Sequence, residues 1–210
     1  MKKKIVLIGA GGFGREVFHI IDKKKYQVIG YIDNVKNIGH PLSADIIGND
    51  NLIERLVSEN ISENVCISVG NLKIREKLFD LVSINGLNTP RIFHSSAIIS
   101  GNVEIGKGSI IYPGAILMDG VKIGKGVLIN SNVTIGHDSI VGNYCNINPG
   151  ANIAGKVKIG KNTVIGIGSN VREEIVVGNN VIVGGGSMIT KNIISNSMNY
   201  GVPSKLIRHI

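Results

Sequence analysis

An aliphatic residue returns at every sixth position through nearly half of the chain. The series runs without a break from Ile99 to Ile189, and every member is Ile, Leu or Val. A small or β-branched residue follows four places after nearly every member, as at Ser109, Ala115 and Cys145. A period of six fits neither an α-helix nor an ordinary two-sided strand. It is typical of a solenoid of short strands, each of which directs one large and one small side chain inward.

The repeat length sets the size of one coil. Three hexads close a triangular coil, so residues eighteen apart should lie on neighbouring coils at the inter-strand spacing of about 4.8 Å. The unbroken register then corresponds to about five coils. Glycine often follows the aliphatic position, and the whole chain has 28 glycines, 4% aromatic residues and no tryptophan. Glycine-rich corners around a narrow aliphatic core fit this composition, and the sequence therefore predicts a parallel β-helix.

A different pattern precedes the repeats. A short apolar strand, Ile5 to Ile8, leads into the glycine-rich turn Gly9 to Gly14, which opens a helix expected to reach about Lys23. A second strand, Gln27 to Ile32, ends at Asp33. This order is typical of domains that hold the phosphates of a nucleotide at a helix N-terminus and its ribose on the acidic residue. The alternative is a tight strand-to-helix turn that binds no ligand.

The first domain is short. A helix over about 50–58, a strand over Val65 to Val69 and a helix over about 74–82 complete it. Binding a dinucleotide across a switch point requires two mononucleotide-binding halves, and the sequence has room for only one. The half-domain argues against an NAD-dependent oxidoreductase and favours one nucleotide or a nucleotide-linked substrate. The predicted domains are a Rossmann-like α/β nucleotide-sugar-binding domain (1–90), a β-helix (91–195) and a C-terminal tail (196–210).

Charge and composition exclude several classes of protein. The formal net charge is +8, but the lysines are scattered over the predicted corners without interleaved aromatic residues, so we expect no nucleic-acid partner. The positive charge suits a solvated surface together with a phosphate-bearing ligand. No stretch approaches the roughly 20 apolar residues of a membrane span, and no signal-peptide pattern begins the sequence. We expect a cytoplasmic protein without membrane insertion.

One histidine lies within the regular coils. His137 follows the inward Ile135 at a corner, with Asp138 beside it, and a neighbouring carboxylate can set the tautomer and basicity of an imidazole that acts as a general base. The alternative is an exposed corner histidine with an incidental acid. Gly155 lies eighteen residues on, where its N–H could bind an oxyanion. A zinc site of the carbonic anhydrase type would need about three histidines, so we expect no metal.

These motifs together resemble the NeuD/PglD family of bacterial sugar acetyltransferases over essentially the full length. The matching features are the glycine turn, the acid that ends the second strand, the histidine–aspartate pair, the hexads and a C-terminal motif: Gly9–Gly14, Asp33, Gly70–Asn71, Ile135–Asp138 and Gly201–Pro203. The resemblance implies a left-handed β-helix, a homotrimer with its active site between subunits, and acetyl-CoA as acyl donor.

The resemblance also implies roles for individual residues. His137 would be the general base and Asp138 the partner that tunes it. Positions that match donor contacts of the family are Asn146, Gly155, Ile167 and Gly185. Positions that match acceptor contacts are Gly11, Gly12, Phe13, Asp33, Asn34 and Gly70. Relatives that act on UDP-4-amino sugars often have histidine where this chain has Phe13 and Asn146, so the identity of the acceptor stays open.

The expected function is acetyl transfer from acetyl-CoA to an amino or hydroxyl group of a nucleotide-activated sugar in bacterial surface glycan biosynthesis. Transfer would be direct, with His137 as base and no covalent acyl-enzyme. Two alternatives remain. The acceptor could be a free sugar such as a sialic acid, which would be O-acetylated, or the chain could be a non-catalytic nucleotide-binding scaffold.

Overall fold

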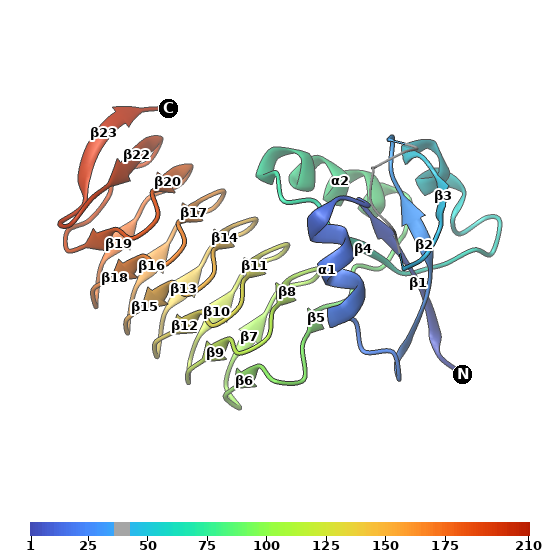
Figure 1. Cartoon of the computed structure of the whole chain (residues 1–210), viewed down its shortest axis with the longest axis horizontal. Coiled ribbons are helices and arrows are strands. Elements are labelled where there is room, and N and C mark those ends of the chain that lie inside the picture. The colour runs from blue at the N-terminus through green and yellow to red at the C-terminus, as the bar shows by residue number, and fades with distance from the viewer. Residues whose placement is uncertain (36–42) are drawn as a thin grey trace. The chain divides into compact units, whose positions relative to one another are not determined.

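The computed structural model describes residues 1–35 and 43–210, which form two compact units, Met1–Ile92 and Phe93–Ile210 (Figure 1). The first unit is an α/β domain. Its elements in chain order are β1 (Lys3–Ile8), α1 (Gly12–Ile20), β2 (Tyr26–Ile32), β3 (Ile46–Gly48), the 3₁₀ helix η1 (Asp50–Arg55), β4 (Val65–Ile67) and α2 (Leu72–Ile84).

The first unit is built on a four-stranded parallel sheet with strand order β3-β2-β1-β4. The last four residues of β1 are at most 2% exposed, as expected for a strand covered on both faces. Because the strands are parallel, the carboxyl ends of β1, β2 and β4 lie at one edge of the sheet. The chain order reverses beside β1, and ligands of such sheets bind at this kind of switch point.

Several local features differ from the sequence prediction. Strand β4 ends at Ile67 rather than Val69, and α2 spans Leu72–Ile84 rather than about 74–82. Helix α1 ends at Ile20 rather than near Lys23, because the Asp22 carboxylate accepts a hydrogen bond from the Lys24 N–H at 2.8 Å and closes a turn. The helix predicted over about 50–58 is the shorter 3₁₀ helix η1. Strand β3 was not predicted, and its three residues are too few to show a period.

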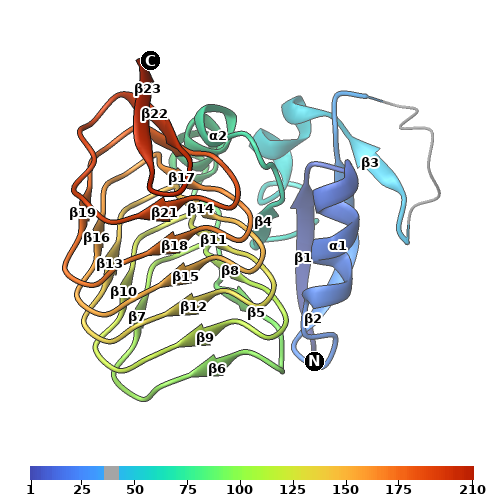
Figure 2. The same ribbon diagram turned by 60° about the vertical axis from the view of Figure 1, so that its left-hand side comes forward.

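The second unit is a left-handed parallel β-helix, whose triangular coils are visible in Figure 2. Residues eighteen apart pair in parallel register, as Thr134 pairs with Asn152 and Asn152 with Asn170. Its strands are β5 (Ile92–Phe93), β6 (Ile98–Ile99), β7 (Glu104–Ile105), β8 (Ile110–Ile111), β9 (Ile116–Leu117), β10 (Lys122–Ile123), β11 (Leu128–Ile129), β12 (Thr134–Ile135), β13 (Ile140–Val141), β14 (Asn146–Ile147), β15 (Asn152–Ile153), β16 (Lys158–Ile159), β17 (Val164–Ile165), β18 (Asn170–Val171), β19 (Val176–Val177), β20 (Val181–Val183), β21 (Met188–Ile189), β22 (Ser197–Tyr200) and β23 (Lys205–His209).

The strands form three sheets, one along each side of the triangle. The orders are β19-β16-β13-β10-β7, β21-β18-β15-β12-β9-β6 and β23-β22-β20-β17-β14-β11-β8-β5. Residues 196–210 carry β22, which continues the last of these sheets in parallel, and β23, which pairs antiparallel with β22. The predicted fold class is confirmed: an α/β domain is followed by a hexapeptide β-helix.

The hexad residues form the core. From Ile111 to Ile189 every large member of the series is at most 4% exposed, and the small positions from Ser109 to Ser187 are buried as well. Glycine after the large position allows tight stacking. A Cβ at Gly142 would lie 2.7 Å from the backbone nitrogen of Lys161 on the next coil, a distance that real Cβ atoms do not adopt. The core and its spacing therefore follow directly from the six-residue pattern.

Hydroxyl groups at the small inward positions join successive coils. The Thr163 hydroxyl donates to the Gly178 carbonyl at 2.9 Å and accepts from the Val181 N–H at 3.2 Å. Ser109 and Ser139 make the same two kinds of bond to their next coils. Backbone groups that a turn leaves without a strand partner are thereby satisfied inside the core.

Replacing Thr163 by valine should lower the free energy of unfolding by about 1–3 kcal/mol, because a buried N–H and a buried carbonyl lose their partner while the side-chain volume stays nearly the same. Urea unfolding followed by circular dichroism measures this change. Thr134→Val is the matched control, since the Thr134 hydroxyl bonds to Asn152 on the outer surface and should contribute within about 0.5 kcal/mol. Equal effects of the two substitutions would contradict the role of the inward hydroxyl.

Candidate active site

His137 and Asp138 occupy the corner between β12 and β13. Asp138 has φ +59°, in the left-handed region that Asp tolerates better than most residues. The Asp138 N–H donates to the Asp119 carbonyl at 3.0 Å, and the His137 carbonyl accepts from the Lys156 N–H at 2.8 Å. The coils on both sides therefore hold the backbone of this corner in place.

The two side chains form a pair. His137 Nδ1 lies 2.8 Å from Asp138 Oδ2, and each side chain is 61% exposed. When Nδ1 carries the proton, it donates to Asp138 and leaves Nε2 free to accept a proton. This is the arrangement that a histidine general base requires.

Glycines on the two neighbouring coils leave room for the His137 and Asp138 side chains. A Cβ at Gly120, on the preceding coil, would lie 2.6 Å from Asp138 Oδ1. A Cβ at Gly155, on the following coil, would lie 2.5 Å from His137 Nε2. The carboxylate and the imidazole thus rest against the backbones of neighbouring coils, and Nε2 faces Gly155.

The N–H of Gly155 makes no hydrogen bond to any residue within 1–35 or 43–210. The neighbouring Lys156 N–H is used by the His137 carbonyl. A free backbone donor therefore lies next to the nitrogen that would accept a proton. Together they can serve a reaction in which a nucleophile loses a proton while a carbonyl oxygen gains negative charge.

The other predicted donor-contact residues lie away from this corner. Asn146 lies on β14, in a different sheet from β12. Ile167 and Gly185 stack on one another at the corner that follows β17, where a Cβ at Gly185 would lie 2.9 Å from the Ile167 side chain. One chain therefore brings only Gly155 of this set to His137.

The predicted acceptor residues gather at the carboxyl edge of the sheet in the first unit. They follow β1 (Gly11, Gly12 and Phe13), β2 (Asp33 and Asn34) and β4 (Gly70). Asp33 ties two of these segments together, because its Oδ2 accepts from the Ala10 N–H at 2.8 Å and its Oδ1 from the Val35 N–H at 2.9 Å. Asn34 donates to Asp50 at 2.7 Å. Asp33 therefore helps to shape the glycine turn, a role that the sequence did not reveal.

The glycine turn faces open space. No atom lies within 4 Å of a Cβ placed on Gly11 or Gly70, and the Arg15 guanidinium, 3.8 Å away, is the nearest to Gly12. Arg15 lies in the first turn of α1, and none of the described residues pairs with it. A cation at the positive end of a helix is unfavourable unless an anion binds there. Sequence analysis missed Arg15, although a basic residue directly after a glycine turn is a recognisable signal.

A cavity of about 440 Å³ lies beside the end of β2, β3 and η1. Asp33, Asn34 and Arg55 contribute its polar groups, and Ile46, Ile47 and Leu52 contribute apolar side chains. Its volume lies in the usual range for small-molecule sites, and a mixed apolar and polar lining suits a flat heterocycle. This cavity extends the predicted acceptor site towards β3.

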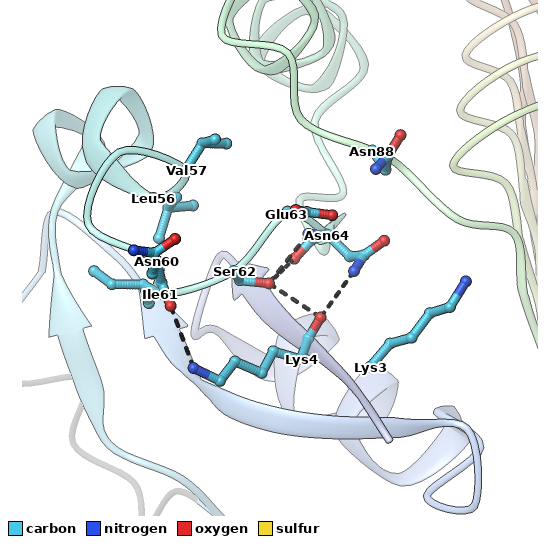
Figure 3. A pocket seen from close by; sticks show the side chains of 10 residues that line it. All are labelled: Lys3, Lys4, Leu56, Val57, Asn60, Ile61, Ser62, Glu63, Asn64 and Asn88. Carbon is cyan, nitrogen blue, oxygen red and sulfur yellow. Dashed lines mark hydrogen bonds between the residues drawn. The ribbon is translucent and has the colours of Figure 1, made fainter. Parts of the chain in front are cut away.

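A second cleft, of about 370 Å³, lies at the opposite edge of the sheet (Figure 3). None of the predicted site residues lines it. Its polar groups bond to one another: Lys4 Nζ donates to the Asn60 carbonyl, and Asn64 Nδ2 and the Ser62 hydroxyl both approach the Lys4 carbonyl. These contacts stabilise the edge of the sheet and point to no ligand.

The described ranges contain no group of three or more His, Cys, Asp or Glu side chains that could hold a metal ion. Among the same residues, no helix has the length and apolar character that crossing a bilayer requires.

Comparison with known proteins agrees with this architecture. The PglD N-terminal domain model matches residues 4–82, and the bacterial transferase hexapeptide (six repeats) model matches residues 120–155 and 156–191. No curated protein matches the chain.

Several solved structures are similar over nearly the whole length. The acetyltransferase domain of PglB from Neisseria gonorrhoeae is 28% identical, with 98% of this chain and 100% of that chain covered and a TM-score of 0.91. PerB from Caulobacter crescentus, in complex with CoA and GDP-perosamine, is 25% identical, with 97% of each chain covered and a TM-score of 0.92. WeeI from Acinetobacter baumannii is 26% identical, with 98% of this chain and 100% of that chain covered and a TM-score of 0.82.

A PglD-type domain joined to a transferase hexapeptide β-helix defines a class of acyltransferases. The chain belongs to the NeuD/PglD-like family of acetyltransferases within that class. The family predicted from the sequence is confirmed.

Proposed function

We propose that the protein transfers an acetyl group from acetyl-CoA to an amino or hydroxyl group of a nucleotide-linked sugar, in the cytoplasm, for bacterial surface glycan biosynthesis. The observation that carries this proposal is the corner where His137 Nε2 faces a free Gly155 N–H. Two similar structures support the substrates: PerB was solved with CoA and GDP-perosamine, and the PglB domain with acetyl coenzyme A.

The proposed transfer is direct. His137 Nε2 accepts the proton of the acceptor nitrogen or oxygen as that atom forms a bond to the thioester carbon. Asp138 holds Nδ1 and stabilises the imidazolium that results. The Gly155 N–H donates to the carbonyl oxygen while it carries negative charge, and the C–S bond then breaks to release the thiolate of CoA.

Neither cysteine suits an acyl-enzyme. Cys145 is fully buried, and its thiol donates to the Gly160 carbonyl at 3.0 Å. Cys66 is 2% exposed, and burial raises the pKa of its thiol to about 12, so the nucleophilic thiolate is scarce at neutral pH. Direct transfer requires neither group.

The carboxyl edge of the first unit is the proposed acceptor site. The glycine turn and Arg15 would bind the phosphates, since the helix dipole and a cation with no partner in the described ranges both favour negative charge there. The cavity beside Asp33 and Asn34 would hold the nucleoside. Gly70 lies at the same edge, where its lack of a side chain leaves the approach open.

Replacing Arg15 by alanine should raise the KM for the acceptor by about ten- to a hundredfold, which corresponds to losing one charge-assisted hydrogen bond. The KM for acetyl-CoA should hardly change. Steady-state kinetics with each substrate varied in turn separates the two effects. Glu16→Ala, one position along the same helix turn, is the control. If Arg15→Ala left both KM values unchanged, a free sugar without phosphate would be the better acceptor.

We further propose a homotrimer with the active site between subunits. Asn146, Ile167 and Gly185 lie on sides and corners of the triangle other than the His137 corner. A groove between adjacent β-helices could bring such positions of one chain beside His137 of its neighbour. Light scattering should give three times the chain mass of 22.4 kDa under assay conditions, whereas a monomer with full activity would exclude a shared site.

A further inference from the structure

At three corners of the β-helix, a side-chain oxygen of the next coil accepts a hydrogen bond from a backbone N–H. We call this side-chain acceptor a cap. The backbone N–H groups of Lys125 and Lys161 donate to the side-chain oxygens of Asn143 and Asn179, each at 2.9 Å. The N–H of Asn179 donates to the Ser195 hydroxyl, also at 2.9 Å. Asn143 and Asn179 follow the large inward residue of their hexads by two places, as His137 does. Ser195 lies beyond the regular hexads and follows the buried Ile193, which pairs with Val177.

Each capping oxygen lies where the preceding residue would have its Cβ if that residue were not glycine. A glycine precedes every capped residue, at Gly124, Gly160 and Gly178. A Cβ on any of these glycines would lie 2.5 Å from the capping oxygen, closer than real Cβ atoms approach such a group. A side chain at this position of the repeat therefore excludes the cap.

The Gly155 position, on the coil next to His137, lacks both parts of this arrangement. Gly155 is preceded by Ala154, which carries the methyl group that the capped corners lack. The next coil offers Glu173, and its carboxylate lies 3.4 Å from Arg172 Nε. The Gly155 N–H has no partner among the described residues.

The residue that precedes the corner differs between the two coils that meet at Gly155. At Gly136 a Cβ would lie 2.6 Å from the Gly155 nitrogen, so this glycine lets the His137 coil stack tightly below Gly155. Ala154 has a real Cβ at the same position of the next hexad, where the capped corners have glycine.

We infer that Ala154 is a positioning residue whose methyl group keeps the side chain of residue 173 from capping the Gly155 N–H, so that this donor stays free for the oxygen of a bound acyl group. The inference rests on the proposed function, because it assigns the donor to the acyl carbonyl. The capped N–H groups of Lys125, Lys161 and Asn179 combine a preceding glycine with an Asn or Ser side chain on the next coil. Gly155 instead follows Ala154 and has Glu173 eighteen residues on.

A double-mutant cycle tests the inference. The variant Ala154→Gly/Glu173→Asn rebuilds the glycine and asparagine of the capped corners and should lower kcat by about 10²–10³-fold, the usual effect of removing one oxyanion donor. Each single substitution should change kcat by less than about threefold, so the two effects should be strongly non-additive. The KM for acetyl-CoA should change little, and the unfolding temperature should not fall.

Amide hydrogen exchange of Gly155 reports the cap independently of activity. Exchange should slow in the double variant and stay fast in both single variants. Lys161→Asn is the matched control, because Asn143 follows Gly142 and its N–H makes no bond within the described ranges. That variant should cap Asn143 at another corner and leave kcat unchanged.

The outcomes distinguish a failure of the role assigned to Ala154 from a failure of the proposed acetyl transfer. Slow exchange of Gly155 in Glu173→Asn alone would show that the Ala154 methyl does not exclude the cap. A capped double variant with normal kcat would show that the Gly155 N–H is not the donor. If the wild-type protein transferred no acetyl group to any sugar, the proposed function would fail while the exchange data still tested the role of Ala154.

Discussion

Replacing His137 by alanine should lower kcat by about 10²–10⁴-fold, the usual contribution of a positioned general base. The side chain is 61% exposed and, within residues 1–35 and 43–210, its polar contact is to Asp138 alone, so the unfolding temperature should stay within about 2 °C of the wild type. CoA release measured with a thiol reagent at saturating substrates gives kcat directly. Asp138→Asn should cost less than His137→Ala, because the imidazole stays in place.

The matched control is His209→Ala, which removes another exposed histidine of the second unit from β23. It should leave kcat unchanged. Near-normal turnover of His137→Ala would show that another group, or water, removes the proton.

Replacing Gly155 by alanine should lower kcat by about 10²-fold, the scale of effect that a displacement of about 1 Å produces in a catalytic group. The new Cβ would lie 2.5 Å from His137 Nε2, so the imidazole must turn away from the reacting atoms. Stability should change little, because the nearest atoms to that Cβ all belong to an exposed side chain that can move.

Gly101→Ala is the control for this substitution, since no atom lies within 4 Å of a Cβ at that position. A crystal structure of Gly155→Ala should show the imidazole rotated from its wild-type position. Unchanged kcat with a rotated imidazole would contradict the assigned role of Nε2.

The β-helix could be predicted closely because the six-residue repeat determines which side chains point inward and which residues pair between coils. One large and one small inward residue per six, repeated without a break, leave a single register in which Thr134 pairs with Asn152. That register also predicted that Gly155 lies beside His137, since eighteen residues make one coil. The free N–H of Gly155 is the structural detail that supports this pairing.

Other parts of the site depend on contacts between residues far apart in the sequence, which no local sequence pattern predicts. The Asp33 carboxylate bonds to the N–H of Ala10, a residue on another strand–helix connection, and only the folded sheet brings them together. Arg15 is a candidate phosphate ligand because the glycine turn is open and the guanidinium has no partner in the described ranges. The cap excluded by Ala154 is visible only by comparison with three other corners.

The central claim is best tested by incubating the purified protein with acetyl-CoA and a panel of nucleotide-linked sugars, each paired with its free sugar, and identifying products by mass spectrometry. We expect one acetyl group on a nucleotide-linked sugar, one CoA released per product, and no product with His137→Ala above about 1% of the wild-type rate. Acetylation of the free sugars alone, or transfer that survives the loss of His137, would contradict the claim.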